Sequence, residues 1–162
     1  MTVKYVVLSE EIRDEIENLR KVASKIHERS AEVPENQKEK ELYLDSLALN
    51  LQAFYTGVEH IFESIASKVD GEVPFGEHWH NDLLAQMNTD LMEIRAQVIS
   101  DDLRDDLKEL LAFRHVIRNI YSFTIDEKRL MRLCNGLDAL SKKLFGELNK
   151  FSEFLQTSGK NS

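Results

Sequence analysis

Cysteine, proline and glycine are all scarce in this chain of 162 residues, which contains 1 Cys, 2 Pro and 6 Gly. A single cysteine excludes an internal disulfide and a zinc site built from cysteine pairs, and it fits a reducing, cytoplasmic location. Cys134 falls within a leucine-rich pattern, so we expect a buried thiol rather than a nucleophile. With 42% hydrophobic and 31% charged residues, the composition favours a helical globular protein.

Long hydrophobic runs are absent as well. No stretch approaches the roughly 18 to 20 uninterrupted apolar residues that cross a bilayer, and residues 1–11 are too short and too acidic for a signal peptide. We therefore expect no membrane association. Basic residues are in deficit, since 21 Lys and Arg face 29 Asp and Glu, for a formal net charge of -8. This balance argues against broad nucleic-acid binding, so any contact with RNA must be local.

Apolar residues recur at helical spacing along the chain, whereas no segment alternates as a strand does. The spacing predicts five helices, over about 9–26, 47–65, 77–92, 101–121 and 126–155. Ser9 is the expected N-cap of the first helix and Ser100 that of the fourth. We predict an all-α, up-and-down helical bundle that forms one domain over residues 1–157, with 158–162 a flexible tail.

Arg114 is the most unusual residue in this pattern, because helical spacing places it in the middle of the fourth helix's apolar face. Arg118 lies one turn further on, and two arginines at this spacing repel unless a carboxylate or a bound anion lies between them. The pair is therefore a candidate phosphate site. The alternative is that Arg114 pairs with a buried Glu or Asp of a neighbouring helix, or of a second copy of the chain.

The segment Phe113-Arg-His-Val-Ile-Arg-Asn-Ile-Tyr121 resembles the signature of HEPN-domain, HepT-like ribonuclease toxins. That signature is an arginine, a polar residue, three further residues, a histidine, any residue and a tyrosine. Arg114, His115 and Tyr121 match it. Trp-His-Asn-Asp-Leu-Leu at 79–84 and Phe-Thr-Ile-Asp at 123–126 also resemble one HepT-like branch.

The resemblance implies a homodimer in which the motif lines a cleft at the dimer interface and cleaves RNA without a metal or other cofactor. It also implies a minimal nucleotidyltransferase antitoxin as partner. In some such systems the partner attaches adenylate to the motif tyrosine, which would be Tyr121 here. From the residues alone, Tyr121 is an aromatic side chain of the core or interface whose hydroxyl hydrogen-bonds locally.

One position departs from the signature, because Asn119 stands where the family has histidine. An amide does not transfer a proton near neutral pH, so the usual general acid-base group is missing. Arg114 and Arg118 can only stabilise charge. His115 is then the sole imidazole expected near the motif. It projects about 100° around the helix from Arg114, so it can join the same site only across a dimer interface or if the helix unwinds there. The candidate catalytic residues are Arg114, His115 and Asn119, with Arg118 as a phosphate ligand.

Two other interpretations stay open. In one, the chain is a catalytically inactive HEPN-like interaction module that binds a nucleotidyltransferase. In the other, it is an unrelated structural bundle in which a carboxylate of the same chain pairs with Arg114.

The sequence Glu77-His-Trp-His80 contains metal-ligand spacings, but the second such motif that a di-metal bundle needs is missing. We therefore expect no metal site.

Overall fold

The computed structural model describes residues 2–118 and 125–161. These residues contain helices and no strand, as the sequence predicted. The helical elements are α1 (Val3–Ser30), α2 (Gln37–Ile65), the π-helical segment η1 (Ala66–Asp70), α3 (Trp79–Met87), α4 (Asp101–Arg118) and α5 (Glu127–Asn161).

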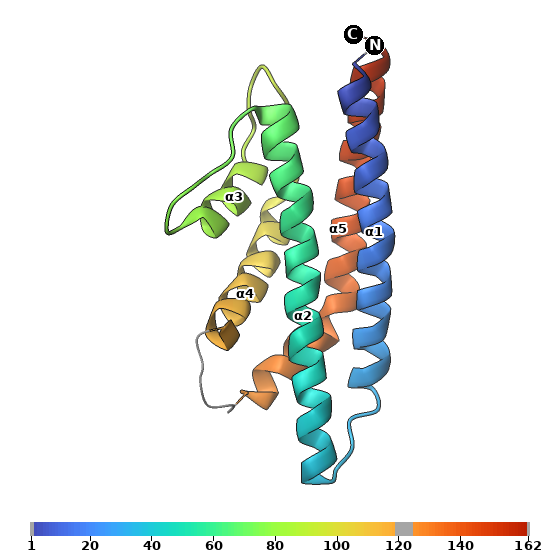
Figure 1. Cartoon of the computed structure of the whole chain (residues 1–162), viewed down its shortest axis with the longest axis vertical. Coiled ribbons are helices and arrows are strands. Elements are labelled where there is room, and N and C mark those ends of the chain that lie inside the picture. Colours follow the sequence, from blue (N-terminus) through green and yellow to red (C-terminus); the bar gives the residue numbers. More distant parts are fainter. Residues whose placement is uncertain (1, 119–124, 162) are drawn as a thin grey trace.

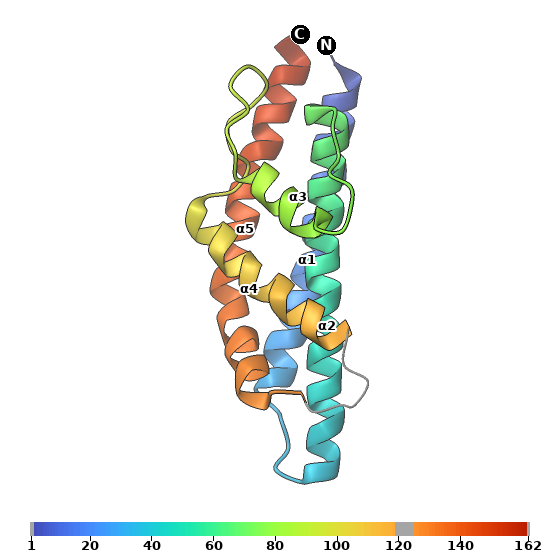
Figure 2. The ribbon, with the colours of Figure 1, turned by 90° about the vertical axis from the view of Figure 1, so that its left-hand side faces the viewer.

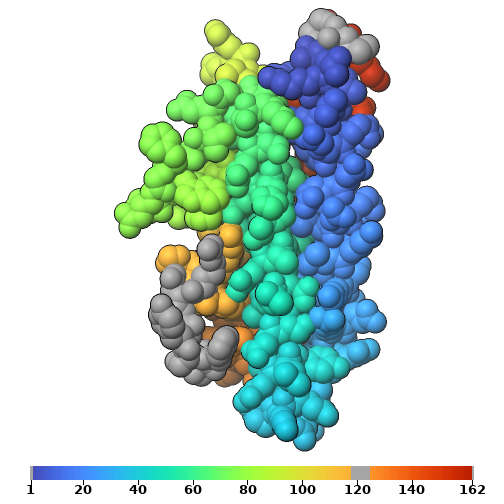
Figure 3. Space-filling view, in the orientation of Figure 1, coloured from blue at the N-terminus to red at the C-terminus, as the bar shows by residue number. Residues whose placement is uncertain are grey.

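Three long helices, α1, α2 and α5, run along the long axis of the molecule (Figure 1). Helices α1 and α5 pack against each other along their length and run in opposite directions, so both chain ends lie at one end of the bundle (Figures 1 and 2). The shorter α3 and α4 lie on one side of α2, and α4 crosses obliquely between α5 and α2 (Figure 2). The space-filling view shows α3 and its preceding loop projecting beside α2 (Figure 3).

The core consists of apolar stripes that repeat every three or four residues on the long helices. On α1, for example, Ile12, Ile16 and Leu19 are each at most 2% exposed. Burying a side chain of this size contributes roughly 1.5–3 kcal/mol relative to leaving it in water. Within the described ranges, no helix is long and apolar enough to cross a membrane.

The predicted start of the first helix is wrong. Helix α1 begins at Val3, and Ser9 lies inside it rather than at its N-cap. The Ser9 hydroxyl is buried, donates to the Ser152 carbonyl of α5 at 3.1 Å and lies 2.6 Å from the Ser152 hydroxyl. Leu8 is fully buried, so packing against α5 extends the helix backwards past a residue that local chemistry favours as a cap.

Helix α5 also extends further than predicted, at its C-terminal end. The helix continues through Asn161, into residues for which the sequence predicted a flexible tail. The backbone N–H of Thr2 donates to the Gly159 carbonyl at 2.7 Å, and Gly159 is buried. This hydrogen bond joins the beginning of α1 to the last turns of α5.

Two further boundaries differ from the prediction. Helix α2 begins earlier, at Gln37, because the Asn36 side chain caps it by accepting backbone N–H groups. Helix α3 ends at Met87 rather than near 92. Beyond it the chain turns back, and Arg95, 4% exposed, donates to both carboxylate oxygens of Asp70 at 2.7 Å. This buried ion pair attaches the α3–α4 connection to η1.

Helix α4 begins where the sequence predicted. The Ser100 hydroxyl accepts the Leu103 backbone N–H at 3.3 Å, and the Glu147 side chain of α5 accepts both the N–H and the hydroxyl of Ser100. The predicted end of this helix, at Tyr121, lies outside the described residues.

Candidate functional site

Arg114 points from α4 toward α2, where it meets a buried carboxylate. Its Nη1 donates to Glu59 Oε1 at 2.5 Å, and the two side chains are 12% and 3% exposed. An unpaired guanidinium at this depth would cost several kcal/mol, so the ion pair satisfies the charge that the helical pattern places on an apolar face. The alternative in which Arg114 pairs with a carboxylate of a neighbouring helix is thereby confirmed, with Glu59 as the partner.

The second oxygen of Glu59 binds a histidine of α3. His80 Nδ1 lies 2.5 Å from Glu59 Oε2, and the His80 ring lies against Trp79 with 3.6 Å between ring centroids. A carboxylate only accepts hydrogen bonds, so Nδ1 carries the proton in this contact. Glu59 therefore joins α2, α3 and α4 in one network, and the His80 side chain keeps 25% of its surface exposed.

Tyr55 lies one turn before Glu59 on α2, with Arg114 5.8 Å from its ring centroid. Its hydroxyl is buried and has no hydrogen-bond partner in the part of the chain that the structure describes. Burial raises the pKa of Tyr55 above its ordinary value, and the negative charge of Glu59 acts in the same direction, whereas Arg114 opposes it. Tyr55 is therefore a neutral phenol at physiological pH.

A groove of about 910 Å³ opens beside this network, between the beginning of α3, the exposed face of α4 and the beginning of α5. Lys108, Arg129 and Arg132 line it, against two carboxylates, Glu77 and Glu109. The remaining lining residues are His78, His80, Asn81, Leu111, Ala112, His115 and Val116. Cationic side chains thus gather at one place on a chain whose net charge is -8.

The prediction that His115 is the sole imidazole near the motif is wrong, because His80 lines the same groove. Packing of α3 against both α2 and α4 places His80 there. Arg114 projects toward the core and His115 toward the groove, as their positions on the helix require. Glu59 contacts Arg114 on the core side and His80 at the wall of the groove, so these hydrogen bonds link the core to the groove.

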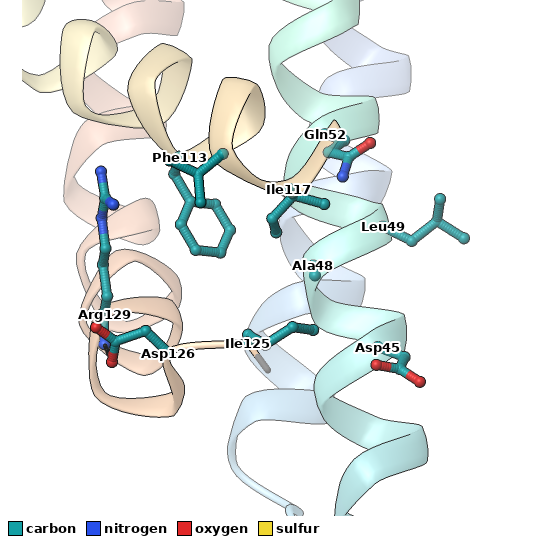
Figure 4. A pocket seen from close by; sticks show the side chains of 10 residues that line it. Asp45, Ala48, Leu49, Gln52, Phe113, Ile117, Ile125, Asp126 and Arg129 are labelled. Atoms are coloured by element: carbon teal, nitrogen blue, oxygen red, sulfur yellow. Dashed lines mark hydrogen bonds between the residues drawn. The ribbon is translucent and has the colours of Figure 1, made fainter. Parts of the chain in front are cut away.

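A second cavity, of about 320 Å³, lies between α2, the last turns of α4 and the beginning of α5 (Figure 4). Apolar side chains line it from all three sides, Leu49 on α2, Phe113 and Ile117 on α4, and Ile125 just before α5 (Figure 4). Arg129 lines both cavities and stacks on Phe113, with 5.6 Å between its guanidinium carbon and the ring centroid.

Of the predicted site residues, Arg114 and His115 are described in full. Arg118 is the last residue of α4, but its side chain, like all of Asn119 and Tyr121, lies outside the described residues. No three His, Cys, Asp or Glu side chains come together as metal ligands do within 2–118 and 125–161.

Sequence reasoning missed Glu59 and the three groove cations. A signal for Glu59 was present, because Tyr55 and Phe62 lie one turn either side of it and mark that part of α2 as buried. A carboxylate inside an apolar stripe needs a positive partner, as Arg114 does.

The protein is thus an all-helical bundle in which a buried Arg-Glu-His network lies beside a groove lined by three cationic side chains. The sequence matches the family model described as HepT-like protein over residues 46–155, which run from α2 into α5. This match spans more than half of the chain, so the chain belongs to the HepT-like family of the HEPN superfamily. The interpretation as an unrelated bundle is therefore wrong. Neither the curated proteins nor the solved structures include a match.

Proposed function

We propose that this chain is the HepT-like component of a toxin-antitoxin pair and that it is a metal-independent endoribonuclease. The observation that best supports this is the groove, in which Lys108, Arg129 and Arg132 lie beside His80 and His115. Cationic side chains bind phosphates and imidazoles transfer protons, and cleavage of RNA by its own 2′-hydroxyl needs both.

The cationic side chains have different proposed roles. Arg114 is paired with Glu59, so its charge is already compensated and its main task is to hold that carboxylate in place. Lys108 and Arg132 are exposed to solvent in the groove. They are therefore the proposed phosphate ligands, together with Arg118 at the end of α4. Asn119 can donate and accept hydrogen bonds but cannot carry the proton.

The proposed assembly follows from the family resemblance. It is a cytoplasmic homodimer whose motif lines a cleft between the subunits, bound by a minimal nucleotidyltransferase antitoxin. Tyr121 is the proposed acceptor of adenylate from that partner. Transfer of a negatively charged nucleotide onto the motif tyrosine would repel RNA and silence the activity.

A second candidate function is a catalytically inactive interaction module that binds the nucleotidyltransferase. Two observations favour it. Asn119 replaces the motif histidine, and Arg114 is compensated within the chain rather than available to a substrate.

Cleavage of a labelled single-stranded RNA in the presence of a chelator tests the proposal. We expect the native protein to cleave. The double variant Lys108→Gln/Arg132→Gln should bind the RNA with lower affinity and a shallower salt dependence, by about 0.7 units of slope per lost phosphate contact on a single strand. Lys150→Gln is the matched control, since Lys150 is an exposed cation of α5 that does not line the groove. A native protein that leaves RNA intact and still binds the nucleotidyltransferase would favour the second function.

A further inference from the structure

We propose that His80, held by Glu59, is the general base of the RNA cleavage reaction and takes the place of the histidine that the motif lacks. The inference rests on the proposed function and adds a catalytic residue from α3, outside the motif on α4. Glu59 is the positioning residue of this pair, because it acts through His80 and is itself 3% exposed.

The geometry around His80 fixes its imidazole ring. Nδ1 lies 2.5 Å from Glu59 Oε2, and the ring lies against Trp79. With Nδ1–H donating to the carboxylate, the neutral ring has its unprotonated nitrogen at Nε2, which is the tautomer a general base needs. The side chain is 25% exposed and lines the groove, so a bound substrate can approach it.

A purely structural role explains less of this arrangement. Arg114 already compensates the charge of Glu59 at 2.5 Å, so the second oxygen of the carboxylate needs only a hydrogen-bond donor, which need not be an imidazole. The other oxygen of Glu59 nevertheless accepts a hydrogen bond from the imidazole ring of His80, at the wall of the groove. A buried carboxylate that orients a solvent-accessible imidazole is the arrangement by which proteins prepare a histidine for proton transfer.

The reaction balances without metal, oxidant or other co-reactant. His80 Nε2 takes the proton of a ribose 2′-hydroxyl as the 2′-oxygen forms a bond to the adjacent phosphorus. The bond from phosphorus to the 5′-oxygen breaks, its electron pair stays on that oxygen, and His115 supplies the proton that the leaving oxygen takes up. The products are a 2′,3′-cyclic phosphate and a 5′-hydroxyl, and exchange with water restores both imidazoles.

Other charges share the groove and will shape the pH dependence. Glu59 contacts His80 from α2, and Arg114 approaches it through Glu59. The remaining charged or titratable groups are Glu77 and His78 before α3, Lys108, Glu109 and His115 on α4, and Arg129 and Arg132 on α5.

The test measures cleavage by the full-length chain in chelator. His80→Asn keeps an amide N–H near the place of Nδ1 but cannot carry the proton, and we expect a loss of about 100- to 10,000-fold in rate. His80→Ala opens space at the wall of the groove, and added imidazole should restore at least about a tenth of the lost rate. His60→Asn is the matched control, since His60 is exposed on α2 and does not line this groove.

A second substrate separates base from acid. When sulfur replaces the 5′-oxygen, the leaving group needs no proton. His115→Asn should then regain most of its rate, whereas His80→Asn should stay slow. With this substrate the rate of the native protein should rise with pH, because only the base is then required, and His80→Asn should lose that rise. Glu59→Gln, rescued in part by Glu59→Asp, should show the same altered pH profile.

The outcomes distinguish the two proposals. A native protein that cleaves, together with a His80→Asn variant of unchanged rate, would overturn the role of His80 and leave the proposed function standing. Loss of rate in His80→Ala without imidazole rescue, at an unchanged melting temperature and pH profile, would also overturn it. A native protein that does not cleave would remove the proposed function, and the inference with it.

Discussion

Replacing Glu59 with leucine should destabilise the fold strongly, because it leaves Arg114 charged and nearly buried without its partner. The Arg114 side chain is 12% exposed and donates to Glu59 at 2.5 Å. Removing one member of such a buried pair costs about 3–5 kcal/mol, which for a chain of this size lowers the melting temperature by about 6–20 °C. Leucine fills a volume similar to that of glutamate, so the loss reports the charge rather than a cavity.

The double variant Glu59→Leu/Arg114→Met separates pairing from packing. Both charges are then gone and apolar groups fill the space, so the double variant should come within about 1 kcal/mol of the native protein. His80 loses its carboxylate partner too, but its exposed part can hydrogen-bond to water.

Urea denaturation followed by far-ultraviolet circular dichroism measures all four members of this cycle. Protein concentration must be held constant, since the stability of the proposed homodimer depends on it. A Glu59→Leu variant that loses less than about 1 kcal/mol, or a double variant whose cost equals the sum of the two single variants, would show that Glu59 and Arg114 do not depend on each other.

Three further predictions concern other parts of the bundle. Asp70→Asn should cost about 2–4 kcal/mol and increase hydrogen exchange in the α3–α4 connection, because Arg95 loses a buried charged partner; unchanged exchange there would contradict the role of this ion pair. Burial raises the pKa of Cys134 to about 12, so the thiol should react with Ellman's reagent at pH 8 only after unfolding in urea, and rapid labelling of the native protein would show otherwise. Gly136→Ala and Gly146→Ala should each raise the free energy of unfolding by about 0.5–1 kcal/mol, since both positions are exposed within α5 and have open space for a methyl group; a decrease in the urea midpoint would contradict this.

The sequence predicted the fold class because amphipathic spacing is a local signal. Each of the five α-helices of the described residues was anticipated, although the π-helical segment η1 was not, and Ser100 was correctly expected to cap α4. The errors lie at the ends, where distant contacts decide. Ser9 has the chemistry of a cap, yet Leu8 and the contact with Ser152 carry α1 past it, and that contact joins residues too far apart for a local pattern to reveal.

The candidate site was predicted only in part, for the same reason. Because Arg114 lies on an apolar face, the sequence correctly predicted that a carboxylate or an anion must pair with it. It could not choose Glu59, because the choice depends on how α4 crosses α2. Helical spacing also places His80 on a short helix, but it does not indicate which residue the imidazole contacts. The contact between His80 and Glu59 follows from the packing of α3, which joins residues 21 positions apart.

The decisive experiment determines the end groups of RNA incubated with the native protein in chelator. We expect fragments that carry a 2′,3′-cyclic phosphate and a 5′-hydroxyl, formed at a rate that chelator leaves unchanged and that His80→Asn lowers by at least about 100-fold. Intact RNA, or fragments with a 3′-hydroxyl formed only when a divalent metal is added, would contradict it.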